Sequence, residues 1–334
     1  MFLLKRKDYT CHDVRENADA DRENKFFQSV RMTAMPSERS PHWKAYAALG
    51  LGVLTLGFSA IFTRAANAPA SVVSFYRMAI GTLVLLIPFA SRFKRKRTLA
   101  SRGLMLAVLA GIFFALDLAA WSTGINYSGA TIPTLMGNMA PVCVGLGAWL
   151  IFKEKLNSKF WLGLTISLLG AMLVIGLDSS GNLQFNAGAL FGLLAAVFYG
   201  GYLLIAQKGR AQLDALSFFW IATLSSAASL LLLAVVLNDP LTGYPISTYL
   251  NFFGLGVLVQ AIGWLAINYA QGFLPASLVS PTLLIQPLLT AILAGPLLGE
   301  TFSAVEMLGG VAVLGGIVIV YRSRQVTKVV GETI

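Results

Sequence analysis

Ten apolar runs, separated by short polar turns, follow one another along the chain from residue 45 onward. Each run approaches the roughly 20 residues that a helix needs to cross the hydrocarbon of a bilayer. The runs lack the alternation of barrel strands, and lipid offers no partner to an open backbone, so we predict helices. The predicted spans are residues 45–63, 69–89, 103–124, 128–152, 159–177, 187–206, 215–237, 247–271, 276–298 and 303–321.

Two stretches of the chain are diverged copies of one unit, offset by 146 positions. The offset is clearest in the last two predicted spans of each half. It predicts that the ten spans form two five-helix repeats. The matched pairs are Ala130 and Ala276, Pro141 and Pro287, Glu154 and Glu300, Gly163 and Gly309, and Gly170 and Gly316.

Positive charge indicates that the two repeats cross the membrane in opposite directions. Lys153, Lys155 and Lys159 flank the internal turn of the first repeat, whereas the matching turn of the second, residues 299–301, has no Lys or Arg. Lys and Arg otherwise gather in the loops between spans two and three and between spans six and seven, and after the last span. Because positive loops stay in the cytoplasm, we expect both termini there. The predicted fold is an all-α integral membrane protein with ten transmembrane helices as two inverted five-helix repeats, a pattern found in many secondary transporters.

The composition excludes an ordinary soluble protein, because 56% of the residues are hydrophobic, 12% are charged and the mean hydropathy is +0.72. The net charge of +10 comes from short loops, so we interpret it as an orientation signal and expect no nucleic-acid partner. His12 and His42 precede the first span, and Cys11 and Cys143 show no paired spacing. We therefore predict no metal site, no cofactor and no catalytic residues.

Polar segments flank the membrane region. The first of them lacks the apolar core of a secretory signal peptide, so we expect a disordered cytoplasmic tail. Met32 and Met35 are candidate natural starts, because each opens a short basic lead into the first span. The expected domains are an N-terminal tail over residues 1–43, repeats over residues 44–177 and 187–322, and a cytoplasmic C-terminal tail over residues 323–334.

Short motifs at residues 127–130, 138–141 and 152–154 recur in the second half at residues 274–276, 286–287 and 298–300. They resemble the motifs of the EamA-type transporters of the drug/metabolite transporter superfamily. The similarity covers about residues 44–322 and implies a ten-helix carrier in the cell inner membrane, often an exporter of amino acids, other metabolites or drugs. Members often have an Arg in the second helix, and Arg77 stands at that place. Lys153 replaces a Gly that members show before the first Glu, a difference expected to affect only the turn.

Arg77 and Asp117 are ionisable residues deep inside predicted spans, where charge is costly and marks a functional hypothesis. Both lie roughly 10–12 Å below the outer membrane surface, from 1.5 Å of rise per residue. Two interpretations stay open. The pair either exchanges a proton or receives a substrate carboxylate, or it is a structural ion pair that locks spans two and three.

The two residue pairs conserved by the repeat are expected to shape the helices. Glu154 and Glu300 are at water-facing helix ends, so we interpret them as turn or capping residues. Pro141 and Pro287 fall within apolar runs, where a kink permits rocking or is simply a structural bend.

Polar and aromatic residues within the apolar runs are the candidate substrate contacts, because buried amides need partners that a central aqueous cavity would supply. Bonds between helices and placement of Trp at the membrane interface are the alternative roles. The candidates are Trp121, Asn138, Gln260, Trp264, Asn268 and Gln286.

We therefore predict a secondary transporter of small molecules that works by alternating access, with proton coupling left open. The chain has no Walker motif, so ATP is not its direct energy source. An uncoupled facilitator or channel is the alternative. A membrane-embedded enzyme is disfavoured, because the spans contain no His and no GxSxG motif. The substrate, the direction and the oligomeric state are not specified by the sequence.

Overall fold

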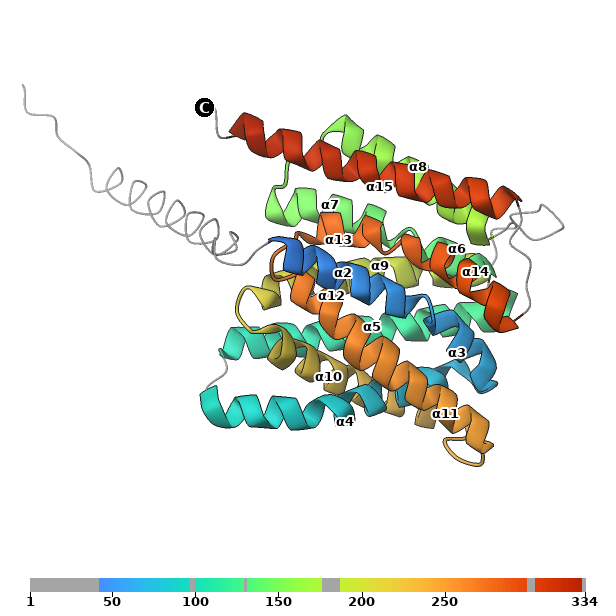
Figure 1. Cartoon of the computed structure of the whole chain (residues 1–334). Helices are drawn as coiled ribbons and strands as arrows, with labels where there is room; N and C mark the ends of the chain where they lie inside the picture. The colour runs from blue at the N-terminus through green and yellow to red at the C-terminus, as the bar shows by residue number, and fades with distance from the viewer. Residues whose placement is uncertain (1–41, 97–99, 129–130, 176–186, 299–303, 332–334) are drawn as a thin grey trace, which may run out of the picture. The chain divides into compact units, whose positions relative to one another are not determined.

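The computed structural model describes residues 42–96, 100–128, 131–175, 187–298 and 304–331, and every element in these ranges is helical (Figure 1). Ten segments within them are long and apolar enough to span a membrane, which confirms the predicted class and number of spans. The elements are α2 (His42–Leu56), α3 (Ser59–Ala66), α4 (Ala70–Lys96), α5 (Ser101–Ser128), α6 (Thr131–Gly137), α7 (Ala140–Phe152), α8 (Ser158–Ile175), α9 (Ala187–Arg210), α10 (Ala215–Val236), α11 (Ile246–Gly254), the π-helix η1 (Leu255–Trp264), α12 (Leu265–Ala270), α13 (Ala276–Thr282), α14 (Ile285–Leu298) and α15 (Ala304–Gly331).

Four of the ten spans are divided, where the apolar pattern predicted continuous runs. The first span is interrupted between α2 and α3, the fourth between α6 and α7, and the ninth between α13 and α14. The eighth span changes its helix type, passing from α11 through η1 to α12. Helix breaks and π-helical turns inside a membrane are tolerated where they face protein or a cavity rather than lipid.

Prolines determine where the fourth and ninth spans break. In a continuous helix, the N–H of residue 141 would bond the carbonyl of Gly137, but Pro141 has no N–H and α6 ends at Gly137. Pro287 likewise cannot bond Leu283, and α13 ends one residue earlier. Both prolines therefore lie in the first turn of a new helix, where a missing N–H has no cost. They were expected within helices, and they instead mark interruptions at equivalent places in the two halves.

Four glycines bring α8 and α15 into direct backbone contact along a line that we call the glycine seam. A methyl group on Gly170 would lie 2.5 Å from the carbonyl oxygen of Gly309, and one on Gly163 would lie 2.7 Å from that of Gly316. The two helices run antiparallel and lie side by side in Figure 1. Close approach at small residues is the usual way in which membrane helices associate without a hydrophobic driving force.

The contacts in the glycine seam are reciprocal with respect to the internal repeat, which matches Gly163 with Gly309 and Gly170 with Gly316. The first glycine of α8 contacts the second of α15, and the second of α8 contacts the first of α15. Between them, the Ser167 hydroxyl donates to the carbonyl of Val313 at 3.2 Å, and these two residues are themselves 146 positions apart. This reciprocal pattern is what a two-fold axis between the two helices requires.

Two further glycines bring α4 of the first half against η1 of the second half. A methyl group on Gly81 would lie 2.7 Å from Cγ of Gln260, and one on Gly256 would lie 2.5 Å from Cβ of Ile80. The helix α5 packs against α9 and α10 beside them. As a result, polar residues of α4, α5, α9 and η1 gather within the bundle.

Candidate functional site

Arg77 links the two halves of the protein from the eighth residue of α4. Its Nε donates to Oε1 of Gln260 on η1 at 2.9 Å, and its Nη1 makes a longer contact of 3.5 Å with the Ser59 hydroxyl at the start of α3. The guanidinium is thus held between spans one, two and eight. The close packing at Gly81, one helical turn further along α4, makes this reach to η1 possible.

Asp117 on α5 interacts electrostatically with Arg77 and with the hydroxyl of Tyr199 on α9. Among the residues that the structure describes, Arg77 and Asp117 form no direct ion pair, because Arg77 is directed to Gln260 and Ser59. The structure brings the two charges near each other, as their depth predicted, but leaves them separate. Their role in coupling or in structure stays a prediction.

Four aromatic rings from three helices surround the middle of the cluster. Phe114 of α5 stacks on Tyr202 of α9 with their ring centroids 4.6 Å apart, and it lies 4.8 Å from Trp264 of η1. Trp264 also packs edge-on against Tyr202 at 5.5 Å and against Tyr199 at 5.9 Å. Sequence reasoning missed both tyrosines. Their signal was two hydroxyls three residues apart on one helix face of a predominantly apolar run.

Asn268 on α12 is fully buried and continues this network toward the predicted cytoplasmic side. Its Nδ2 donates to the Tyr202 hydroxyl at 2.7 Å and to the carbonyl of Trp264 at 2.9 Å. The backbone carbonyl of Asn268 accepts a hydrogen bond from Nε of Arg210 at 2.7 Å. Arg210 thus joins the end of α9 to α12 just below the cluster.

Three of the predicted contact residues each have a buried polar atom without a hydrogen-bond partner: Nε2 of Gln260, Nε1 of Trp264 and Oδ1 of Asn268. The exposed fractions of these residues are 0%, 3% and 0%. An unpaired buried donor or acceptor costs about 1–3 kcal/mol, so native proteins keep few of them. The residues are four positions apart along η1 and α12, and Gln271 extends the row with its unpaired Oε1. The π-helix that presents two of them is a rare element often found at functional sites.

The other predicted contacts lie outside this cluster. Trp121 donates from Nε1 to the Thr134 hydroxyl at 3.0 Å, which ties α5 to α6, and Asn138 bonds the Thr134 carbonyl within its own span at 2.9 Å. Gln286 is half-buried in the first turn of α14, just after the break. The structure therefore groups three of the six candidates with Arg77 and Asp117, and places the other three elsewhere.

Glu154 follows the end of α7 and accepts a hydrogen bond from the Ser277 hydroxyl in the first turn of α13 at 2.6 Å. Gln207 of α9 accepts from the backbone N–H of Ala276 at the same helix start, at 2.6 Å. Glu154 therefore serves a helix N-terminus of the other half of the chain, where a carboxylate is stabilising. Glu300 lies outside the described residues.

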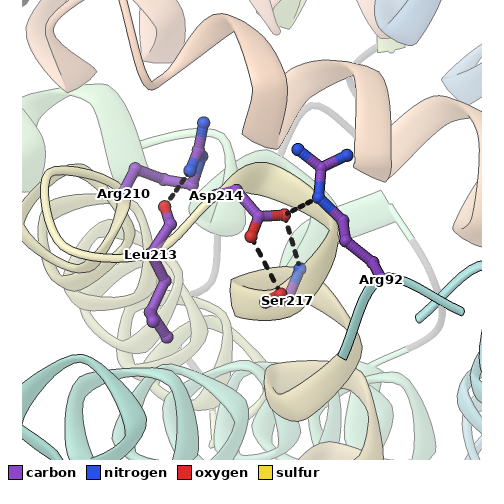
Figure 2. Close-up of polar contacts among 5 residues, drawn as sticks. All are labelled: Arg92, Arg210, Leu213, Asp214 and Ser217. Carbon is purple, nitrogen blue, oxygen red and sulfur yellow. Dashed lines mark hydrogen bonds and ion pairs between the residues drawn. The ribbon is translucent and has the colours of Figure 1, made fainter. Parts of the chain in front are cut away.

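A second polar group lies at the turn between α9 and α10 and organises the helix ends (Figure 2). Asp214 caps α10 by accepting from the backbone N–H of Ser217 at 3.2 Å and from its hydroxyl at 2.9 Å. Nε of Arg92, near the end of α4, lies 3.4 Å from the same carboxylate, and Nη1 of Arg210 donates to the Leu213 carbonyl. Arg92 is about half-exposed, so its ion pair contributes little to stability. We interpret this group as a structural clamp.

In the described part of the chain, no three His, Cys, Asp or Glu residues lie close enough together to hold a metal ion. The central cluster offers one arginine, one aspartate, unpaired amide and indole groups, and aromatic faces. Such a set can hold a small polar molecule by hydrogen bonds and stacking.

Comparison with known proteins finds chains that are similar over most of this one. The family model described as "EamA-like transporter family" matches residues 43–176 and again residues 186–322. The uncharacterized transporter YdfC of Bacillus subtilis is 25% identical over 74% of this chain and 80% of its own length. The pseudopaline exporter CntI of Pseudomonas aeruginosa is 23% identical over 78% of this chain and 89% of its own. A protein known from its crystal structure superposes with a TM-score of 0.71 at 16% identity, over 83% of this chain and 96% of that one.

Proposed function

The chain belongs to the EamA-like transporter family, and from this premise we propose that it exports a small metabolite, such as an amino acid or a drug, across the cytoplasmic membrane. It is a multi-pass membrane protein, and its relatives are named as transporters. One relative is named as an exporter, which favours the outward direction. The distribution of Lys and Arg favours cytoplasmic termini.

The observation that carries the proposal is a cluster in which half-buried Arg77 and Asp117 lie beside the buried side chains of Gln260, Trp264 and Asn268. Its members come from spans two and three of the first half and span eight of the second. Unpaired polar atoms in the interior of a membrane bundle are costly unless a ligand or water uses them. A site shared between the halves is also where carriers with internal repeats bind substrate.

Alternating access between two inverted five-helix repeats is the mechanism that we propose. The reciprocal contacts of the glycine seam support a two-fold relation between the halves, and the antiparallel course of α8 and α15 fits an axis in the membrane plane. The equivalent breaks before Pro141 and Pro287 supply places where helix halves can reorient. Rocking of one repeat against the other would expose the cluster to each side in turn.

Asp117 is the proposed coupling residue. It lies near Arg77 without a direct ion pair, so its proton can be exchanged without breaking a salt bridge. Proton exchange at Asp117 would then accompany the movement of the substrate through the protein. Uncoupled export is the alternative, and a transmembrane pH gradient separates the two.

The experiment compares metabolites in the medium of bacteria that express the wild-type chain with those expressing Asp117→Asn at equal membrane abundance. We expect one metabolite class to accumulate with the wild type alone. Reconstitution in liposomes then tests whether an imposed proton gradient accelerates the flux of that metabolite. Equal accumulation with Asp117→Asn would remove Asp117 from the mechanism. No accumulation with either chain, at verified abundance, would refute export.

A further inference from the structure

The unpaired atoms on η1 and α12 are ordered by chemical type. At the η1 end they are donors: Oε1 of Gln260 accepts from Arg77, whose guanidinium can only donate, so the amide nitrogen of Gln260 is the unpaired atom. The indole N–H of Trp264, four residues on, is also a donor without an acceptor. Both side chains are almost completely buried. This end of the row therefore needs an acceptor.

The α12 end of the row has the opposite need. Nδ2 of Asn268 is fixed as a donor by the carbonyl of Trp264, which can only accept, so Oδ1 is the unpaired atom. Gln271 repeats the arrangement: its Nε2 donates to the carbonyl of Leu203 at 3.3 Å, and its Oε1 has no partner. The unpaired atoms thus change from donors to acceptors between Gln260 and Asn268. These residues are eight positions apart, which is roughly 10 Å along the helix at a rise of 1.5 Å or less per residue.

The charges near the donor end determine which acceptor group of a ligand can bind there. Arg77 places a positive charge beside Gln260, and Asp117 lies close by but forms no direct ion pair with it among the described residues. A planar guanidinium with neighbouring N–H donors matches a carboxylate. A phosphate dianion would bring two negative charges to a site that has one arginine, with the carboxyl group of Asp117 close by. A single carboxylate fits better.

We propose that Arg77, Gln260 and Trp264 form a subsite for a carboxylate of the transported molecule, while Asn268 accepts an N–H or O–H from the rest of that molecule. The inference rests on the proposed transport function and adds the chemical class and the orientation of the substrate. The carboxylate faces the donor end of the row on η1. The opposite end of the substrate lies nearer to α12 and the predicted cytoplasmic side.

The test measures binding to the purified full-length chain in nanodiscs by calorimetry. The probes are the standard amino acids and short aliphatic and aromatic carboxylic acids, each paired with its own primary amide. We expect at least one acid to bind and its amide to bind about tenfold more weakly or worse, as for the loss of a hydrogen bond to a charged group. Equal binding of acid and amide, or no binding of any acid, would overturn the subsite.

Two variants locate the subsite. Trp264→Phe keeps an aromatic ring against Phe114 but removes the indole N–H together with the ring that carries it, so the dissociation constant of the acid should rise about tenfold. Trp149→Phe is the matched control, because Trp149 is exposed on α7, and it should leave binding unchanged. Gln260→Glu keeps the acceptor for Arg77 but puts a carboxylate oxygen in place of Nε2, so the acid should lose roughly a hundredfold in affinity.

Melting of each variant without ligand checks that it is folded. Should Gln260→Glu fail to fold, Trp264→Phe against Trp149→Phe decides alone. If Trp264→Phe bound the acid with wild-type affinity, the subsite would be refuted, because the indole N–H would then not contact the bound carboxylate. Metabolite export by the wild-type chain, measured separately in the medium, shows whether the proposed function survives that result.

Discussion

Replacing Gly170 with alanine tests the contact that holds α8 against α15. The new methyl group would lie 2.5 Å from the carbonyl oxygen of Gly309 and 2.6 Å from the amide nitrogen of Val313. Ordinary contact begins at 3.4 Å, so the helices must separate by about 0.9 Å at this point. Both obstructing atoms belong to the backbone, and no side-chain rotation relieves the clash.

The expected cost follows from overpacking and from a lengthened hydrogen bond. Overpacking a tight contact costs about 1–3 kcal/mol. Separation also stretches the bond from the Ser167 hydroxyl to Val313, now 3.2 Å, which contributes about 1 kcal/mol. We therefore expect Gly170→Ala to destabilise the fold by about 2–3 kcal/mol.

Gly315→Ala is the control, because it makes the same change on α15 at a position with nothing within 4 Å of the added methyl group. Alanine in place of glycine in a helix should leave stability unchanged or raise it by up to about 1 kcal/mol. At roughly 2 °C per kcal/mol for a chain of this size, the two variants should melt about 4–8 °C apart.

The assay is thermal unfolding of the purified chains in one detergent, followed by fluorescence and run at one heating rate. Gly309→Ala should behave like Gly170→Ala, because its methyl group would lie 2.7 Å from the carbonyl of Gly170. The double variant should cost less than the sum, since both changes open one contact. If Gly170→Ala melts at or above Gly315→Ala, the packing described for α8 and α15 is wrong.

Three further substitutions test the cluster and its supports. Arg77→Lys keeps the charge but cannot reproduce the Nε bond to Gln260, so export should fall at least roughly tenfold at unchanged abundance, measured in the medium; an unchanged export rate would speak against the site. Tyr202→Phe removes an acceptor of Asn268 and should destabilise the fold by about 1 kcal/mol, seen as a lower melting midpoint; a higher midpoint would contradict that bond. Asp214→Ala removes the cap of α10 and should cost about 1 kcal/mol, whereas Asp214→Asn should retain most of it, and equal loss in both would exclude capping.

The number of spans could be predicted from the sequence because an apolar run of membrane length has few other solutions. The breaks could not, since a run such as residues 128–152 has the same hydropathy whether or not its helix is continuous. Proline gave a partial signal: Pro141 and Pro287 were identified, but apolar pattern alone does not show that a helix stops one turn before each of them. The π-helical register of η1 likewise depends on tertiary packing.

Part of the candidate site could also be predicted from the sequence. Gln260, Trp264 and Asn268 were identified because polar groups inside apolar runs are few. Tyr199 and Tyr202 were missed, since tyrosine also occurs at membrane interfaces and only the approach of α9 to α5 makes these rings part of the cluster. The hydrogen bond of Arg77 to Gln260 joins residues 183 positions apart, a distance that no local pattern encodes.

The glycine seam also constrains how such a chain can evolve after a gene duplication. Each of its four glycines leaves room for the backbone of the opposite copy, so a larger residue in one half is penalised through an atom that the other half supplies. The two halves therefore cannot change independently at these positions, because each contact joins one copy to the other. The similarity between the copies is also clearest in the last spans of each half, where these contacts lie.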